Sequence, residues 1–437
     1  MESVYRLPWP RGIRPSAPGS RATRLELFYD LVFVFAFLNV TTATAGNLTV
    51  RGLVQCLLVL SLLWWAWTGF AALGNVVRTD QGIVPFVGFA TTAAAFVFAV
   101  ATPNAFVDRP GSLSGPLVFA VCYLLVRASQ VTIFGWVVRH DPELRRRFLL
   151  LTLPVLAATG FLLLAAVLPD RFADQTTERL VRFGLWLAAI AVEYGVGTAV
   201  RGTGWTVLSA GHWAERHALI VLVALGESVI ALGIGPSETA GLALTWPVII
   251  AAVIGIAVVA ALWWAYFDTL ALACEQALHR TREQRARAGL ARDAYTYLHL
   301  VLVSGIILFA LGLKGLLEEG AEPATGVWGL PLPGFDLLAL YGGVALYLSG
   351  LAALRRRVLR SVGWPAVTAV LLVLALVPVV APLPEMVDLF LLASTTVVVV
   401  AVQTAVDAPL RREVRAVALE EQLAAEAEQT AWRGHHL

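Results

Sequence analysis

The sequence predicts an all-α fold, a polytopic bundle of transmembrane helices. Hydrophobic residues make up 58% of the chain, and the mean hydropathy is +0.76. Charged residues make up only 14%, whereas soluble domains average about 25%. Apolar runs close to the roughly 20 residues that cross a bilayer recur along the chain. These observations exclude an ordinary soluble protein and indicate a multi-pass integral membrane protein.

About twelve such runs can be placed. We expect spans at residues 26–45, 52–73, 82–102, 115–138, 148–168, 180–199, 212–234, 246–268, 296–315, 335–353, 363–381 and 386–405. On this count residues 1–25 form an Arg- and Pro-rich arm, residues 26–405 form the transmembrane domain, and residues 406–437 form a polar helical tail.

Arginine placement predicts the orientation of the bundle. With twelve spans, one side of the membrane carries most of the arginine-rich segments. These are the arm, the connections after the fourth, eighth and tenth spans, and the tail. The other side carries few cations and an acidic loop with Glu318, Glu319 and Glu322. Because positively charged loops stay in the cytoplasm, we expect both termini there and the protein in the cytoplasmic membrane of a cell.

Two features suggest an internal duplication. WWAW, from Trp64, ends the second span as WWAY, from Trp263, ends the eighth, and Glu26 opens the first span as Glu215 opens the seventh. This fits two parallel six-span halves, an arrangement known in transporters. The halves would cover residues 26–200 and 212–405. Paired tryptophans at span ends are also the ordinary aromatic belt, and that alternative stays open.

Ionisable side chains inside apolar spans are costly and mark functional positions by default. Glu26 and Asp30 share a helix face near the cytoplasmic end of the first span, four residues apart. We interpret Glu26 as neutralised by Arg21, Arg24 or a helix end. Asp30 lies deeper, and we assign it to a cation- or proton-accepting approach.

Arg127 of the fourth span and Glu193 of the sixth are expected at similar depths. Each needs a partner in the apolar interior, and the other provides one. A buried Arg–Glu pair can fix the register of two helices without further chemistry. We therefore predict a structural ion pair.

The stretch HWAERHALIVLVALGESVIALG, residues 212–233, combines ionisable side chains with hydrophobicity to an extent that no other stretch reaches. His212 and Arg216 share a face, with Glu215 beside them. His217 points about 140° away from His212, at 100° per residue. The stretch therefore does not present two histidines on one face, as HExxH zinc sites do. We expect no metal here; the polar residues either line a cytoplasmic approach or form an interfacial belt.

The ninth span predicts a partner for Glu227. Lys314, the only lysine in the chain, follows His299 by fifteen residues, just as Glu227 follows His212. If the two helices are neighbours, Glu227 meets Lys314, and His212 meets His299. Such a buried pair can exchange protons. The alternatives are a static salt bridge, or a Lys314 side chain that reaches the outer interface.

Small residues predict close helix packing around this pair. They are Gly226, Ser228 and Gly233 beside Glu227, and Ser304, Gly305 and Gly312 in the ninth span.

No cofactor is expected. Cys56, Cys122 and Cys274 form no CxxC pair, and Cys274 falls in a connection that we place as a cytoplasmic loop. No nucleotide-binding motif is present, and topology and anionic lipid explain the basic loops better than nucleic acid does. The expected partners are membrane lipids and an unidentified small solute or the proton. A homo-oligomer stays open.

Three stretches resemble the bacterial low temperature requirement A family: RLELFYDLVFVFAF, HWAERHALIVLVALGESVIALG and YTYLHLVLVSGIILFALGLK. Their order and spacing fit, and WWAW with the following Asn75 and Asp80 is similar to the family's second-span pattern. This segment, WWAWTGFAALGNVVRTD, carries fewer polar and aromatic residues than the family pattern. The resemblance covers nearly the whole membrane region. It implies a growth phenotype in the cold, and no established reaction, substrate or cofactor.

The leading functional prediction is a secondary transporter or permease, with proton coupling as one form of it. Glu227 and Lys314 would form the charge-exchange centre, and Asp30, His212, Glu215, Arg216 and His299 would line the cytoplasmic approach. One alternative is an intramembrane enzyme that acts on a lipid or lipid-linked substrate through His212, Glu215 and His299. A second is a non-catalytic scaffold or sensor in which every charge is a static lock.

Overall fold

The computed structural model describes residues 14–16, 19–46, 48–108, 111–139, 142–172, 174–199, 207–234, 246–320 and 328–436. Within these ranges the fold is all-helical, apart from an isolated bridge between Pro15 and Val77. The helices that correspond to the expected runs are α2 (Arg24–Ala45), α3 (Val50–Val76), α4 (Val84–Ala101), α5 (Gly115–Val138), α6 (Pro142–Val167), α7 (Gln175–Ala199), α8 (Ala210–Ile234), α9 (Trp246–Phe267), α12 (Leu298–Gly320), α13 (Gly334–Leu359), α14 (Trp364–Val380) and α15 (Glu385–Val406).

Nine helical segments in the described ranges are long and apolar enough to cross a membrane. They comprise α2, α3, α4, α5, α8, α9 with its continuation, α12 with the turns before it, α13 and α15. Two shorter apolar helices, Thr152–Val167 within α6 and α14, accompany them. The chain is therefore a multi-pass helical membrane protein. The count of twelve spans additionally requires α6, α7 and α14 to cross, and it stays a prediction together with the placement of both termini.

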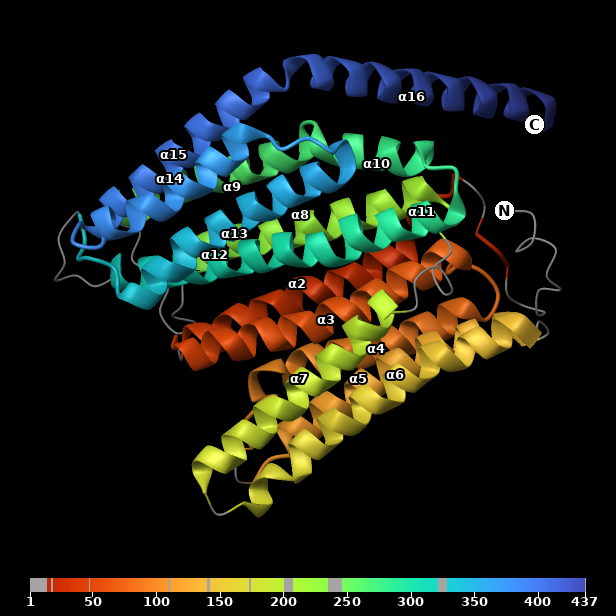
Figure 1. The fold of residues 1–437 in the computed structure, drawn as a ribbon, viewed down its shortest axis with the longest axis horizontal. Coiled ribbons are helices and arrows are strands. Elements are labelled where there is room, and N and C mark those ends of the chain that lie inside the picture. The colour runs from red at the N-terminus through yellow and green to blue at the C-terminus, as the bar shows by residue number, and fades with distance from the viewer. Residues whose placement is uncertain are drawn as a thin grey trace.

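The helices pack in two groups that meet along α2, α3, α8 and α12 (Figure 1). In the first group α2 packs on α3 and α4, and the contacts continue from α4 through α5 and α6 to α7, which returns to α3. In the second group α8 packs on α9 and α12, and the contacts continue from α12 through α13 and α14 to α15, which returns to α9. The order of neighbours is the same in both.

The outside of the bundle is apolar and the inside holds charge. Phe86 is 74% exposed and Val253 is 64% exposed, whereas Arg216 and Glu227 are fully buried. A large apolar surface of this kind marks contact with a membrane or a partner, and for helices of this length lipid is the fitting solvent.

The connection between α9 and α12 is helical, where the sequence predicted a loop. It contains α10 (Leu270–Arg280), α11 (Gln284–Leu290) and a π-helical turn, η3 (Ala291–Tyr297). Cys274 lies in α10 and is buried with Leu270, Ala273 and Leu278, so its placement in a loop was wrong. Apolar residues at this spacing bury one face of a helix too short to resemble a span.

The tail forms α16 (Ala408–His436), in line with the predicted polar helix. Its first turns are tied to the end of α9, because Arg411 and Arg415 both pair with Asp268. From Glu420 to Gly434 it is exposed, and it extends past α10 in Figure 1. Of the acidic loop expected after the ninth span, Glu318 and Glu319 are helical within α12, and Glu322 lies outside the described residues.

Candidate functional site

Helices α2 and α8 run side by side, in parallel and in register. Three side-chain contacts join them, and in each the partners are 186 residues apart in sequence. The pairs are Glu26 with His212, Asp30 with Arg216, and Thr41 with Glu227. A constant offset requires that the two helices advance together, so the pairs form three successive layers from the start of α2 inward.

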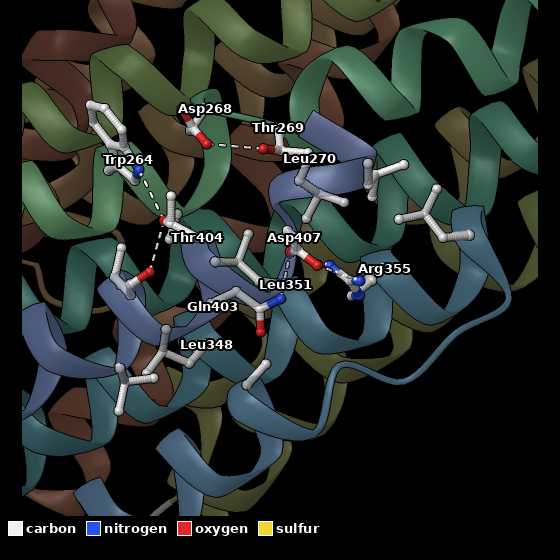
Figure 2. Close-up of a pocket in the computed structure, with 16 residues that line it drawn as sticks. Trp264, Asp268, Thr269, Leu270, Leu348, Leu351, Arg355, Gln403, Thr404 and Asp407 are labelled. Atoms are coloured by element: carbon white, nitrogen blue, oxygen red, sulfur yellow. Dashed lines mark hydrogen bonds and ion pairs between the residues drawn. The ribbon is translucent and has the colours of Figure 1, made fainter. Parts of the chain in front are cut away.

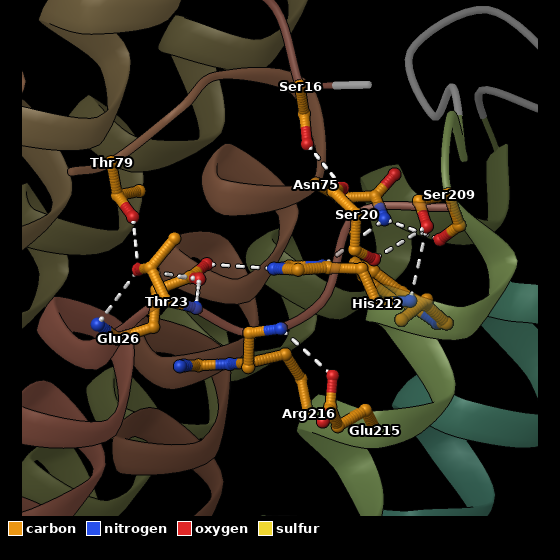
Figure 3. Close-up of polar contacts among 12 residues, drawn as sticks. Ser16, Ser20, Thr23, Glu26, Asn75, Thr79, Ser209, His212, Glu215 and Arg216 are labelled. Carbon is orange, nitrogen blue, oxygen red and sulfur yellow. Dashed lines mark hydrogen bonds and ion pairs between the residues drawn. The ribbon is translucent and has the colours of Figure 1, made fainter. Parts of the chain in front are cut away.

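The first layer sits at the N-terminus of α2 (Figure 3). Thr23 caps this helix and forms a capping box with Glu26, the arrangement that a T-x-x-E sequence favours. The second oxygen of Glu26, Oε1, lies 2.9 Å from His212 Nε2. Glu26 is thus held by its own helix end and by a histidine, and the expected arginines, Arg21 and Arg24, are not its partners in the described contacts.

Asn75 fixes the protonation pattern of His212. Its Oδ1 accepts from Leu208 N at 2.8 Å, which orients the amide so that Nδ2 faces Ser209 O and His212 Nδ1. Because an amide nitrogen only donates, His212 Nδ1 accepts and Nε2 carries the proton given to Glu26. The neutral imidazole therefore satisfies this geometry, with Glu26 as the only charge in the pair.

Glu215 faces the chain that precedes α2 rather than the interior. Its Oε2 accepts from Ala22 N at 2.9 Å. On the same side the loop after α3 is held by Thr79 Oγ1, 2.6 Å from Thr23 Oγ1. In that loop the hydrogen bond from Arg78 lowers the pKa of the Asp80 carboxyl. Glu215 and this loop therefore pack against the chain at the start of α2, beside the first layer.

The second layer is a fully buried ion pair. Arg216 Nη2 donates to Asp30 Oδ1 at 2.8 Å, and Trp67 Nε1 donates to the same oxygen at 2.7 Å. The Arg216 guanidinium also lies over the Trp67 ring, 5.6 Å from its centroid. Asp30 Oδ2 and Arg216 Nε and Nη1 have no hydrogen-bond partner among the described residues. This layer therefore contains buried polar atoms that can form further hydrogen bonds.

The third layer contains the predicted pair of Glu227 and Lys314. Lys314 Nζ lies 2.9 Å from Glu227 Oε1, and α8 packs directly on α12. Two threonines of α2 complete the layer: Thr41 Oγ1 donates to Glu227 Oε1 at 2.5 Å, and Thr42 Oγ1 accepts from Lys314 at 3.1 Å. Glu227 Oε2 has no partner in the described part of the chain. The layer lies eleven residues beyond Asp30, about 16 Å along the helix.

The histidine contact differs from the prediction. His299 lies against His217, with ring centroids 5.3 Å apart, rather than against His212. His217 Nδ1 bonds Trp213 O and His299 Nδ1 bonds Ala294 O, each at 2.8 Å. A carbonyl only accepts, so both rings carry their proton on Nδ1. Tyr266 OH occupies His299 Nε2, at 2.8 Å.

The residue offset explains why one contact was predicted correctly and the other was not. Lys314 follows His299 by fifteen residues, whereas Glu227 follows His217 by only ten. The difference of five residues is about 7.5 Å of helix. Helical side chains lean toward the N-terminus, and the long lysine side chain covers this offset.

The small residues have a different use from the one expected. A Cβ on Gly305 would meet the backbone of Tyr347 and Gly343, and one on Gly312 would meet the backbone of Leu340. These glycines therefore allow α12 to approach α13, not α8. A Cβ on Gly226 or Gly233 would meet nothing within 4 Å, so neither glycine is needed for packing beside Glu227.

The pair of Arg127 and Glu193 is present in the first group of helices. Arg127 Nη2 lies 3.2 Å from Glu193 Oε2. Trp65 Nε1 donates to the same carboxylate at 2.6 Å, and Tyr123 OH donates to it at 2.5 Å. Gln130 accepts from Arg127 at 2.6 Å and donates to Ala66 O. This dense bonding ties α3, α5 and α7 together.

Two pockets are described, and neither is lined by the three layers. One is a cavity of about 60 Å³ where α9, α13, α15 and α16 meet. Figure 2 shows it beside the Arg355–Asp407 ion pair, with Trp264 bonded to Thr404 at its edge. The other is an open groove beside η3. Among the described residues no group of three potential ligands is placed to hold a metal ion.

Several members of the layers were not predicted. Thr41, Thr42 and Trp67 carry no charge that would single them out, and each is one of many threonines or aromatic residues at the right depth. The spacing of Thr41 eleven residues after Asp30, equal to that of Glu227 after Arg216, was the available signal. It has meaning only once α2 and α8 are known to be in register.

Comparison with known protein families and with known proteins found sequences similar to this chain. The family model for the bacterial low temperature requirement A protein matches residues 21–403. An uncharacterized protein, RA0937, of Rhizobium meliloti (strain 1021) is 26% identical over 352 residues, covering 77% of this chain and 78% of its own length. No solved structure matches.

Proposed function

We propose that this chain, which belongs to the bacterial low temperature requirement A family of membrane proteins, is a proton-coupled secondary transporter or permease for a small solute. Its place would be the cytoplasmic membrane. The observation that carries the proposal is the third layer, where Glu227 and Lys314 form a buried ion pair between α8 and α12. Intramembrane ionisable pairs mark ion and substrate pathways.

The layers lie where two packing groups meet. Secondary transporters built from two repeats bind substrate near the midplane, between the repeats. Here α2 belongs to the first group, and α8 and α12 belong to the second. The same order of neighbours in both groups supports two six-helix halves, residues 26–200 and 212–405.

The balance of charge favours proton coupling. The three layers contain three carboxylates, Glu26, Asp30 and Glu227, against two basic side chains, Arg216 and Lys314. With His212 neutral, one negative charge is in excess, and a single added proton cancels it. Glu227 Oε2 and Asp30 Oδ2 are buried acceptors with no described partner, so each can receive a proton.

A pH-jump measurement tests this proposal without knowledge of the solute. The full-length protein would be reconstituted in liposomes on a solid-supported membrane, and the charge displaced by a pH step would be recorded. We expect a transient in the wild type that Glu227→Gln abolishes. Glu193→Gln is the matched control, because it also neutralises a buried, ion-paired glutamate, and it should keep the transient.

Both variants would first be checked for monodisperse elution, so that a misfolded sample is not mistaken for a silent one. A transient of equal size in Glu227→Gln would remove the third layer from the mechanism. The absence of a transient in the folded wild type would contradict proton coupling itself.

A non-catalytic scaffold is the second candidate, and burial favours it. Glu227 is fully buried, Lys314 is 3% exposed, and neither described pocket reaches them. If the Glu227–Lys314 pair is only structural, the pH step should displace no charge in the wild type or in any variant. The enzyme alternative is less favoured, because its three residues bond different partners: His212 contacts Glu26, Glu215 contacts Ala22, and His299 contacts Tyr266.

A further inference from the structure

An open, basic groove of about 620 Å³ lies where α12 begins and α13 ends. Its lining residues are Asp293, Tyr297, Leu298, Ala353, Arg356, Arg357 and Arg360. Three arginines against one aspartate leave two positive charges in excess. The groove is separate from the three layers, although its floor includes part of η3.

The three arginines are not equally available. Arg357 Nε lies 3.1 Å from Asp293 Oδ2, and Arg292 holds the other oxygen of Asp293 at 2.7 Å. Arg356 and Arg360 are exposed and form no ion pair within the described residues. The excess charge of the groove therefore resides on these two guanidinium groups.

Arg360 has an unusual backbone. Its φ of 55° lies in the left-handed region, and it is the only non-glycine residue with a positive φ in the described chain. Glycine is the residue that normally ends a helix in this conformation. Strain kept at one position points to a use for the side chain, and here the side chain lines the groove.

The residues beside the groove are typical of a membrane interface. Val362 and Trp364, just after Arg360 in sequence, are 51% and 62% exposed. Tryptophan concentrates at membrane–water interfaces. Leu298 and Ala353 give the groove an apolar wall. A ligand with an anionic head and an apolar tail matches both parts of this surface.

We propose that this groove binds the phosphate headgroup of an anionic phospholipid, with Arg356 and Arg360 as the phosphate ligands. Guanidinium groups bind phosphate through paired, charge-assisted hydrogen bonds. Basic pockets between transmembrane helices bind anionic headgroups in this way. The proposal is independent of transport, because a scaffold would carry the same site.

The test uses the full chain in detergent and measures binding of a fluorescent phosphatidylglycerol, with phosphatidylcholine as the neutral reference. Arg356→Gln with Arg360→Gln should weaken phosphatidylglycerol binding by about tenfold to 30-fold, since each arginine near anionic lipid contributes roughly fivefold. The matched control is Arg282→Gln with Arg285→Gln, which removes two exposed arginines from the connection between α9 and α12, outside the lining of the groove. This control should change binding by less than about twofold.

Three results would overturn the site. Equal weakening in both double variants would mean diffuse attraction, and unchanged binding in the groove variant would mean that the lipid binds elsewhere. Displacement of the lipid by inorganic phosphate at similar concentration would make the groove a site for a soluble anion.

Arg360→Gly separates binding from folding. Glycine suits the left-handed conformation, so the melting temperature should stay equal or rise. Phosphatidylglycerol binding should nevertheless fall severalfold. A variant that keeps both stability and binding would show that Arg360 is not a ligand.

Discussion

Glu227 engages one carboxylate oxygen and leaves the other free. Oε1 receives Thr41 and pairs with Lys314, whereas Oε2 is buried without a described partner. A static lock would gain by satisfying both oxygens, as Glu193 does with Trp65, Tyr123 and Arg127. The contrast between the two buried glutamates is the reason to assign exchange to one and structure to the other.

The Glu227–Lys314 pair predicts a non-additive effect on stability. Lys314→Met leaves Glu227 charged and unpaired, and breaking a buried pair in this way costs about 3–5 kcal/mol. Adding Glu227→Gln removes the orphaned charge, so the double variant should recover much of the loss. Reversible unfolding in mixed micelles measures the three free energies. Additive losses in the double variant would mean that the two side chains do not interact.

At the residue scale, the sequence predicts charges that need a partner. We predicted that Lys314 and Glu227 form a pair because each follows a histidine by fifteen residues, and because a buried charge requires a compensating partner. The same logic paired Arg127 with Glu193. It could not find Thr41 or His217, since a threonine satisfies itself on its own helix and a neutral histidine resembles other core residues.

Helices α12 and α13 share the most extensive contact among the described elements. A Cβ on Gly343 would meet the backbone of Phe309 and Gly305, and one on Gly312 would meet Leu340. Small residues permit backbones to approach in membranes, where packing rather than hydrophobicity joins helices. Because α12 also carries Lys314 and His299, its seat on α13 fixes the position of both.

Gly343→Ala should therefore destabilise the protein, by about 1–3 kcal/mol as expected of overpacking. The neighbouring Gly342→Ala is the control, because its Cβ would meet only Leu338 Cδ1, at 3.8 Å. The control should be neutral or slightly stabilising, since alanine favours helix. Melting temperatures of the two variants make the comparison. Equal values would mean that α12 and α13 adjust freely.

At the element scale, apolar length predicts long helices well and short ones poorly. The twelve runs correspond to helices whose ends differ by at most six residues, at the start of α6 and the end of α13. The segment with α10, α11 and η3 was predicted as a loop because its arginines dominate its composition. Its helices bury narrow apolar stripes that a window of span length averages away.

At the scale of the whole molecule, the two groups of helices share one order of neighbours. The constant offset of 186 residues shows that α2 and α8 run parallel to one another at the junction. The sequence evidence for a duplication was weak. It rested mainly on the similarity of two tryptophan-containing motifs, and apolar residues in lipid substitute for one another freely. The packing order of the helices does not change when apolar residues are substituted. It therefore supports the proposal of two parallel halves more strongly than the sequence motifs do.

The count of spans is the last point that can be tested directly. If α6, α7 and α14 cross along with the nine apolar segments, an even number of crossings returns the C-terminus to the side of the N-terminus. Arginine placement predicts that this side is the cytoplasm. A green fluorescent protein fused after α16 should then fluoresce, and alkaline phosphatase inserted between α14 and α15 should be active. The reverse pattern would mean either that an odd number of these three helices does not cross or that the whole bundle has the opposite orientation, and a reporter at the N-terminus separates the two.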